Sequence, residues 1–542
     1  MNPLGQDLPR RSFLRSGAVG AAALAGAAGL DLRTATAATA APGAPVATPL
    51  VRAGRRTPMA VATGDVTSRS AVLWARAQRP GRLVAEVMSG RRTRRVRGPW
   101  ATPDSDLTAK IALDGLGPGR EHEVRLAFED EDGHLGGAMR ASFRTASLHE
   151  AATSFVWAGD TCGQGWGINP DLGGLVGYRA MHETRPDFFV HAGDTIYADG
   201  PIQESVTEPD GQVWRNLVIP EVAKVAETLA EFRGRHRYTL LDQNVRAMYA
   251  EVPVIAQWDD HETTNNWWPG EVLEDPRYTQ ERRVDVLAAR GRRAWQEYMP
   301  IADPRSRGGR DRAADDRGHG FAPARIYRKI ERGAHLDVFC LDMRTFKDPN
   351  TPGLEQERTS ILGTEQVDWL IREVRRSKAT WKVISADLPI GVVVPDGPVD
   401  QESLANRDPG QPLGKEQEIA AVLSAFKRHG VRNTVWITAD VHYCAAHHYS
   451  PERAGFTDFD PFWELVAGPI AAGTFGPNEL DGTFGPEVVF QKHAAAPNES
   501  PRAGNQFFGH VAIDGDGLLT ASLRDLTGAV LWSKDLEPER TR

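Results

Sequence analysis

The stretch FVWAGDTC, residues 155–162, and the stretch FFVHAGDTIY, residues 188–197, each run from an apolar segment directly into Gly-Asp-Thr. Short apolar runs that stop at turn residues are typical of buried β-strands. Four later runs have the same form, namely VPVIAQWDDHE (252–262), LDVFCLDMR (336–344), WKVISADLP (381–389) and NTVWITADVHY (433–443). Every run ends in or just before an aspartate, which predicts a set of acidic side chains at strand ends.

Helix-like segments, such as 229–250 and 363–379, lie between most of these runs. Strands that alternate with helices indicate an α/β domain with a buried central sheet. Ligands of such sheets gather outside the carboxyl ends of the strands. We therefore expect one α/β domain over residues 150–542, with its functional site at the aspartate-bearing strand ends.

Residues 59–147 have a different pattern, because short alternating segments follow one another with Gly and Asp-Gly turns between them. This spacing is typical of a small β-sandwich of the immunoglobulin or fibronectin kind. We expect an all-β domain over residues 50–147, and its residues suggest no catalytic site.

The N-terminal segment PRRSFLRSG contains the pair Arg10–Arg11, and an Ala/Gly-rich run and candidate A-x-A cleavage sites follow it. This pattern predicts a twin-arginine signal peptide over residues 1–40, recognised by the twin-arginine translocase. The apolar run is short and rich in glycine, which disfavours a membrane anchor. We expect a protein that is secreted or retained in the cell wall.

The composition limits the classes of partner that the protein can bind. The chain has 542 residues, is 41% hydrophobic and carries a net charge of −8, which argues against a nucleic-acid partner. Its three cysteines are an odd number for an exported protein, so one disulfide and one free thiol is the simplest account. Cys162 follows Asp160 by two residues, which suggests that its thiol is a metal ligand. The alternatives are a buried apolar side chain and one half of a disulfide.

Carboxylates that converge at strand ends repel one another unless cations lie among them. The strand-end acids and the histidines near them therefore predict a multinuclear metal centre. Two metal ions bridged by one carboxylate bind both the attacking and the leaving oxygen of a phosphoryl group. The candidate ligands on this argument are Asp160, Asp194, Asp260 and Asp440, with His261 and His442.

The order GD-x-C, GD-x-x-Y, D-D-H-E and A-D-x-H resembles the motif series of the calcineurin-like metallophosphatases. The variants GDTC, HAGDTIY, WDDHETTNNW, LDMRTF and TADVHY, with ELVAGPIAAGTFGPN at 464–478, resemble the PhoD-type alkaline phosphatases and phosphodiesterases. The resemblance covers nearly all of the chain beyond the signal. It implies a metallophosphatase ββ-sandwich flanked by helices, preceded by the small all-β domain.

The resemblance also implies the cofactors, one Fe³⁺ and one or two Ca²⁺. The ferric ligands would be Asp160, Cys162, Asp194, Tyr197 and His442, with Asp194 as the bridge. Thiolate and phenolate suit a ferric ion, whereas Ca²⁺ takes hard oxygen ligands. Asp260, Asn265 and Asp440 would bind calcium. The choice between Asn265 and Asn266, and the participation of Asp259 or Asp387, stay open.

Two residues are candidates for catalysis. We expect His261 to bind the phosphate or protonate the leaving alkoxide. Arg344 follows a strand and is a candidate clamp for a phosphoryl oxygen. The alternative for Arg344 is a structural ion pair with a nearby carboxylate such as Asp342.

Three functions fit these residues. The first is a secreted phosphoesterase, an alkaline phosphatase and phosphodiesterase that acts on small phosphate esters. The second is a phospholipase D that uses the same metal centre on phospholipids, since some secreted bacterial enzymes of that name resemble this family. The third is a non-catalytic extracellular binding module with structural metals, which ranks last because oxygen-rich sites leave room for water and substrate.

Overall fold

The computed structural model describes residues 57–302 and 323–539. The predicted twin-arginine signal, residues 1–40, lies outside the described residues, as does the polar segment 303–322. Within the described ranges no helix is both long and apolar enough to cross a membrane.

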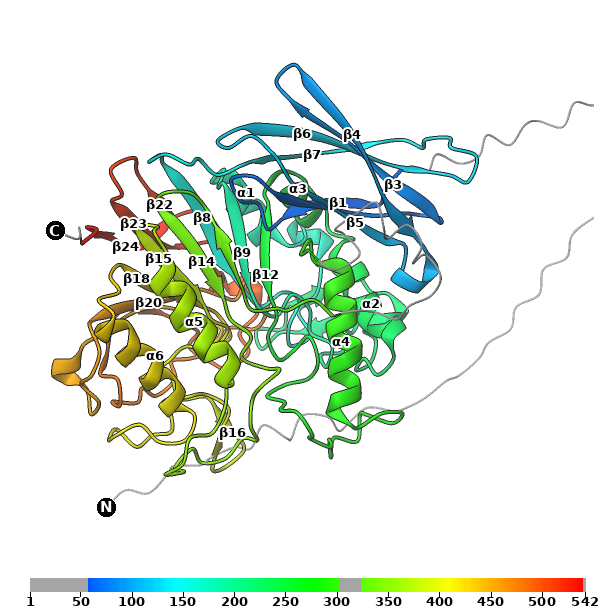
Figure 1. The fold of residues 1–542 in the computed structure, drawn as a ribbon. Coiled ribbons are helices and arrows are strands. Elements are labelled where there is room, and N and C mark those ends of the chain that lie inside the picture. The colour runs from blue at the N-terminus through cyan, green and yellow to red at the C-terminus, as the bar shows by residue number, and fades with distance from the viewer. Residues whose placement is uncertain (1–56, 303–322, 540–542) are drawn as a thin grey trace, which may run out of the picture. The chain divides into compact units, whose positions relative to one another are not determined.

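A nine-stranded sheet forms the first layer (Figure 1). Its strands β8, β9 and β12 run parallel, with Val156 beside Phe189 and Ile255 beside Val190. Their carboxyl ends therefore lie at one edge of the sheet. In spatial order the strands are β24 (Val530–Leu536), β23 (Leu519–Asp525), β22 (Phe507–Ile513), β8 (Thr153–Ala158), β9 (Phe188–Ala192), β12 (Val254–Gln257), β1 (Ala60–Gly64), β2 (Ala71–Arg76) and β5 (Thr108–Leu113).

A seven-stranded sheet forms the second layer. Strands β14, β15, β18 and β20 are parallel within it. The order is β13 (Arg328–Glu331), β14 (Leu336–Cys340), β15 (Trp381–Ser385), β18 (Thr434–Thr438), β20 (Phe462–Val466), β19 (Cys444–Tyr449) and β21 (Pro486–Lys492). Phe155 and Val190 of the first sheet share a buried apolar cluster with Val383 and Ile437 of the second, so the two sheets pack face to face.

Helices cover the outer faces of both sheets. Helices α1 (Val176–Glu183), α2 (Leu229–Thr239), α3 (Gln243–Glu251) and α4 (Val284–Tyr298) contribute to the apolar cluster on the first sheet. Helices α5 (Thr364–Arg376) and α6 (Glu416–Arg428) pack on the second sheet. In α5, Val367, Leu370 and Val374 recur at spacings of three and four residues, which places them on one buried face. The predicted α/β fold, a ββ-sandwich flanked by helices, is confirmed.

The segment before β8 is built from strands, as the sequence predicts. A four-stranded sheet, in the order β4 (Arg92–Ala101), β3 (Gly81–Ser89), β6 (Glu121–Glu129) and β7 (Met139–Arg144), packs through a shared apolar cluster on β1, β2 and β5. Two small hairpins, β10 (Ser205–Thr207) with β11 (Val213–Arg215) and β16 (Pro395–Asp396) with β17 (Asp400–Gln401), lie in the loops of the remaining chain.

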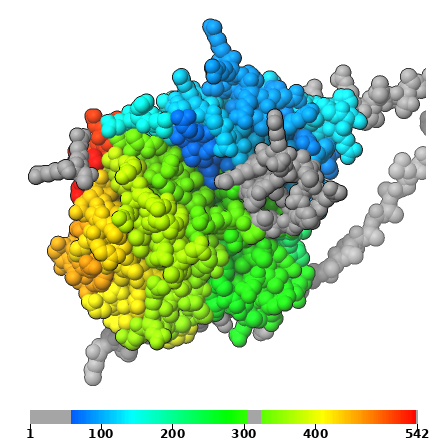
Figure 2. All heavy atoms as spheres, in the orientation of Figure 1, coloured from blue at the N-terminus to red at the C-terminus, as the bar shows by residue number. Residues whose placement is uncertain are grey.

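Strand β1 joins this sandwich to the large sheet, because Gly64 pairs in parallel with Val254 of β12. A Cβ atom on Gly64 would lie 2.4 Å from the carbonyl oxygen of Pro300, so this close approach requires glycine. Farther along, the Trp74 indole N–H donates to the carbonyl of Glu297 at 2.8 Å. Figure 2 shows the blue atoms of the first strands directly against the following segments.

Candidate metal centre

The predicted acids do lie at strand ends, and the ends of both sheets meet. Asp160 follows β8, Asp194 follows β9, and Asp260 follows β12 in the nine-stranded sheet. Asp440 and His442 follow β18 in the seven-stranded sheet. Possible ligand atoms of these residues lie within 4.8 Å of one another in three overlapping groups, Asp160–Asp194–His442, Asp194–Asp260–His261 and Asp259–Asp260–Asp440.

The backbone at these strand ends is left-handed. The φ angle is 67° at Asp160, 51° at Asp194, 64° at Asp440 and 59° at His442. Non-glycine residues rarely adopt this conformation, and it persists where the surrounding structure enforces it, often at functional sites. The strained turns direct the side chains away from the strand and into the space between the two sheets' ends.

Asp160, Asp194 and His442 form the first group. Nε2 of His442 is 3.8 Å from Oδ1 of Asp160 and 2.7 Å from the hydroxyl of Tyr197. Nδ1 of His442 lies 2.5 Å from the carbonyl oxygen of Gly473, so it is the nitrogen that carries the hydrogen. A neutral imidazole then presents Nε2 with a lone pair, as a metal-binding histidine does.

Asp194, Asp260 and His261 form the second group. The backbone N–H of His261 donates to Oδ1 of Asp194 at 3.2 Å, and its Nε2 lies 3.9 Å from Oδ1 of Asp260. The ring of His261 packs on that of Tyr197, with 4.1 Å between centroids. Asp194 therefore belongs to both the first and the second group.

The pKa values of the clustered carboxyl groups are shifted in a way that favours cation binding. Burial, followed by the charges of Asp260 and other neighbouring acids, raises the pKa of Asp160 to about 8, although His261 opposes the shift. Burial and the neighbouring carboxylates also raise the pKa values of Asp194 and Asp440 well above the ordinary value. Both oxygens of the Asp160 carboxylate are buried without a hydrogen-bond partner among the described residues. Orphaned, mutually repelling carboxylates fit a metal site.

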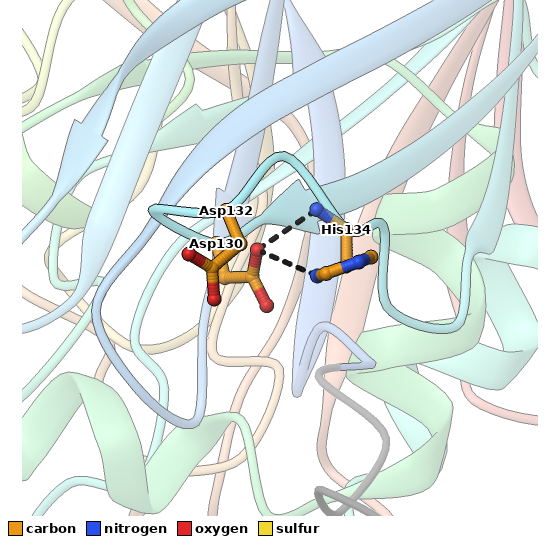
Figure 3. A group of neighbouring side chains, drawn as sticks. All are labelled: Asp130, Asp132 and His134. Atoms are coloured by element: carbon orange, nitrogen blue, oxygen red, sulfur yellow. Dashed lines mark hydrogen bonds and ion pairs between the residues drawn. The ribbon is translucent and has the colours of Figure 1, made fainter.

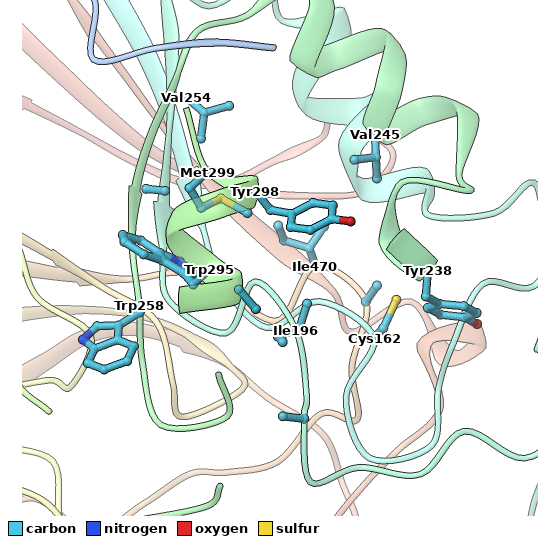
Figure 4. Close-up of a cluster of buried hydrophobic side chains, with 14 of the residues drawn as sticks. Cys162, Ile196, Tyr238, Val245, Val254, Trp258, Trp295, Tyr298, Met299 and Ile470 are labelled. Carbon is cyan, nitrogen blue, oxygen red and sulfur yellow. The ribbon is translucent and has the colours of Figure 1, made fainter. Parts of the chain in front are cut away.

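The ligand role of Cys162 stays a prediction. The residue belongs to none of the three groups, and its side chain is part of the buried apolar cluster, beside Tyr238 (Figure 4). In the metal-free protein, burial and the charge of Asp242 raise the pKa of its thiol well above the ordinary value. Cys340 and Cys444 are also buried, and all three cysteines are free, so the expected disulfide is absent from the described residues.

The predicted substrate clamp, Arg344, has a completely buried side chain. Its guanidinium contacts Asp259, Asp387 and Glu402. The contact with Asp342 is through the backbone, because the N–H of Arg344 donates to Oδ1 of Asp342 at 3.3 Å. The clamp role stays a prediction.

The two asparagines act on the site through their backbones. The N–H of Asn265 donates to Oδ2 of Asp199 at 3.0 Å, and its side chain is exposed. The N–H of Asn266 donates to Oδ2 of Asp260 at 2.5 Å, and its side-chain amide donates to Asp396. The ligand role of Asn265, and the choice between it and Asn266, stay predictions.

The sequence analysis missed two acids that support the site. Oδ1 of Asp199 is 2.7 Å from Nδ1 of His261, which fixes the orientation of that ring. Glu262 accepts the backbone N–H of Thr195 at 2.6 Å and that of Asp259 at 2.8 Å, so it ties the loop after β9 to the loop after β12. The signals were an acid in the Gly-ended loop of HAGDTIYADG and the glutamate of DDHE.

A fourth acid–histidine group lies far from this chemistry, on the exposed turn after β6 (Figure 3). Asp130 accepts the backbone N–H of His134 at 2.8 Å, and the His134 side chain is 80% exposed. Hydrogen bonds within the turn account for this cluster, which also contains Asp132.

Comparisons with known proteins agree with this geometry. Residues 155–523 match the PhoD-like phosphatase family, and residues 45–146 match the N-terminal domain of PhoD-like phosphatases. Alkaline phosphatase D of Bacillus subtilis (strain 168) is 26% identical over 412 residues, which span 71% of this chain and 64% of that protein.

Two solved structures share the fold. A structure of PhoD covers 90% of this chain and 93% of its own, with a TM-score of 0.63 and 18% identity. A purple acid phosphatase from yellow lupin (Lupinus luteus) seeds covers 88% of this chain and 73% of its own, with a TM-score of 0.53 and 14% identity. The family match extends over more than half of the chain, which therefore belongs to the PhoD-like phosphatases.

Proposed function

We propose that the protein is a metal-dependent phosphoesterase that hydrolyses organic phosphate esters. The observation that carries this proposal is the position of Asp194, which belongs to two adjacent groups of possible metal ligands. A shared carboxylate places two cations close together, the arrangement that suits phosphoryl transfer. The family membership supports the same reaction class.

The donor sets suggest which cations bind. Asp160, Asp194 and His442, with the phenol of Tyr197, combine oxygen and nitrogen donors and suit one Fe³⁺. Asp260 and Asp440 supply only carboxylate oxygens, as one or two Ca²⁺ require. When bound, these cations supply Lewis-acid chemistry: they neutralise phosphoryl oxygens and lower the pKa of water.

His261 supplies the proton for the leaving group. Burial lowers the pKa of its imidazole, but the charges of Asp199, Asp260 and Asp194 outweigh burial and raise the pKa well above the ordinary value. In the metal-free protein these charges therefore favour the protonated ring. Asp199 binds Nδ1, so Nε2 is the nitrogen directed toward Asp260 and the ligand groups. A protonated Nε2 there is placed to bind a phosphoryl oxygen or to protonate the leaving alkoxide.

A substrate panel tests the proposal. The purified protein is assayed on p-nitrophenyl phosphate, bis-p-nitrophenyl phosphate and phosphatidylcholine, with calcium and with a chelator. We expect hydrolysis of the first two esters, lost with the chelator. Cleavage of phosphatidylcholine alone would favour a phospholipase D. A metal-loaded protein that is inactive on all three would contradict the proposal and favour a binding module.

We infer that the protein is exported by the twin-arginine route and acts outside the cell or in the cell wall. The pair Arg10–Arg11 in the N-terminal segment supports this inference. Replacement of both arginines by lysine is expected to leave the protein inside the cell. Unchanged export of that variant, measured by immunoblot of the culture medium and cell wall, would contradict the inference.

A further inference from the structure

Arg344 lies in a closed pocket of acidic side chains. Its Nε is 2.7 Å from Oδ1 of Asp259 and 2.9 Å from Oδ2 of Asp387, and its Nη1 donates to Glu402. The three carboxylate side chains are each at most 1% exposed, and the side chain of Arg344 is 0% exposed. The pocket therefore admits no substrate, and it already contains a cation.

The same guanidinium contacts one proposed metal ligand directly and is connected to a second through Asp259. Its Nη2 is 3.6 Å from Oδ1 of Asp440. Oδ1 of Asp259, which accepts from Arg344, also accepts the backbone N–H of Asp260 at 2.8 Å. Asp260 follows β12 of the nine-stranded sheet and Asp440 follows β18 of the seven-stranded sheet. Arg344 thus links ligands that come from opposite layers of the fold.

The surroundings of Arg344 differ from those of an arginine in a simple structural ion pair of this protein. Arg328 is also largely buried, but its guanidinium pairs with one carboxylate, that of Asp65, at 2.7 and 2.8 Å. Arg344 instead faces three buried carboxylates. Two lysines also lie at Glu402: Nζ of Lys347 is 3.4 Å from its carboxylate, and Nζ of Lys415 is 3.5 Å from its carbonyl oxygen. Without the guanidinium, the three carboxylates would form an oxygen-rich pocket of the kind that binds Ca²⁺.

We propose that Arg344 is a positioning residue that serves as a fixed cation beside the metal centre. It orients Asp440 directly and Asp260 through Asp259, and it fills the pocket of carboxylates that would otherwise take up a further divalent ion. Arginine suits this role because its planar guanidinium stays charged and binds several carboxylates in a fixed geometry. The inference rests on the proposed function, in which Asp260 and Asp440 bind metal.

Three variants test the role, namely Arg344→Lys, Arg344→Met and the control Arg328→Met. Bound metal is counted by mass spectrometry, and calcium affinity is measured by competition with a chelator. Arg344→Lys keeps the positive charge but loses the planar guanidinium that binds several carboxylates at once. We therefore expect calcium affinity to fall by about 10- to 100-fold. Arg344→Met in millimolar calcium is expected to bind one more calcium per chain. Arg328→Met should keep the metal content and affinity of the wild type.

Wild-type metal number and affinity in both Arg344 variants would overturn the proposal. If Arg344→Met does not fold, the charge-matched double variant Arg344→Met/Glu402→Gln removes one buried carboxylate together with the arginine. We expect that variant to fold with calcium affinity lowered by about 10- to 100-fold, and unchanged affinity would overturn the proposal. A wild-type protein without metal and without phosphatase activity would overturn the proposed function as well, so the two failures are distinguishable.

Discussion

Nδ1 of His261 lies 2.7 Å from Oδ1 of Asp199, and the two side chains are only 13% and 7% exposed. The Asp199 carboxylate also accepts the backbone N–H of Asn265, so its position is fixed from two sides. Burial raises the pKa of Asp199, but the charge and hydrogen bond of His261 outweigh it, and the pKa is lowered. The pair is therefore a carboxylate and an imidazolium.

Asp199→Asn should lower turnover and change its pH dependence. Loss of the negative charge lowers the pKa of His261, so the proton that the leaving group needs is lost at a lower pH. We expect kcat on p-nitrophenyl phosphate to fall by about 10- to 100-fold, within the range for a lost acid–base contribution. The alkaline limb of the pH–kcat profile should move to lower pH, while the metal content stays constant. An unchanged alkaline limb would contradict the role of Asp199.

Asp194→Asn should abolish most of the activity while the fold is retained. The neutral amide cannot bridge two cations, and the loss of that bridge is expected to lower turnover by at least about 10³-fold. Bound metal should fall as well, as measured by mass spectrometry. Asp130→Asn, in the exposed acid–histidine group, is the matched control and should change neither quantity. Near-normal turnover in the Asp194 variant would refute the bridging role.

Cys162→Ala tests the predicted ligand role of Cys162 against a packing role. The thiol packs in the apolar cluster, so its removal is expected to cost about 1 kcal/mol, a typical value for a small buried change. Thermal unfolding measures this cost. Metal analysis of the exported variant is expected to show a loss of iron with little loss of calcium, and unchanged iron would remove Cys162 from the ligand set.

Removal of metal should make stability fall as pH rises. In the metal-free protein the pKa of Asp160 is raised from 3.8 to about 8, so the native state holds a proton that the unfolded chain releases. Between these values the native state binds more protons, and stability therefore decreases with pH. We expect Tm with a chelator to be lower at about pH 8 than at about pH 5, whereas calcium and iron should remove the difference. A chelated protein whose Tm rises over this interval would contradict the proposed electrostatics.

The convergence of Asp160, Asp194 and Asp260 could be predicted, because parallel strands of one sheet bring their carboxyl ends to one edge whatever the details of the loops. Asp440 was also expected at a strand end, but it belongs to the second sheet, and the packing of the two sheets brings it to the others. The orientation of Cys162 could not be predicted. The expectation that residues two apart share a face holds for extended strands. Asp160 and Cys162 instead have φ angles of 67° and 65°, and the left-handed turn sends the thiol into the apolar cluster.

The partners of Arg344 also could not be predicted from the sequence. Glu402 lies 58 residues away, and Asp259 belongs to the other sheet, so only the packing of the two layers brings them to the guanidinium. Asp199 was overlooked for a different reason. It lies in a Gly-ended loop, where aspartate is common as a turn residue, so the acid in HAGDTIYADG is a weak signal.

The pairing of Gly64 with Val254 has a consequence for how such an enzyme can be divided. β12 has only two neighbours, β9 and β1, and Asp259 and Asp260 follow its end. Removal of the leading strands would leave β12 as an edge strand, and these acids follow its end. An exposed edge strand promotes self-association. The leading β-strands thus support the strand that carries part of the candidate metal centre, and protein engineers should keep β1 together with β12.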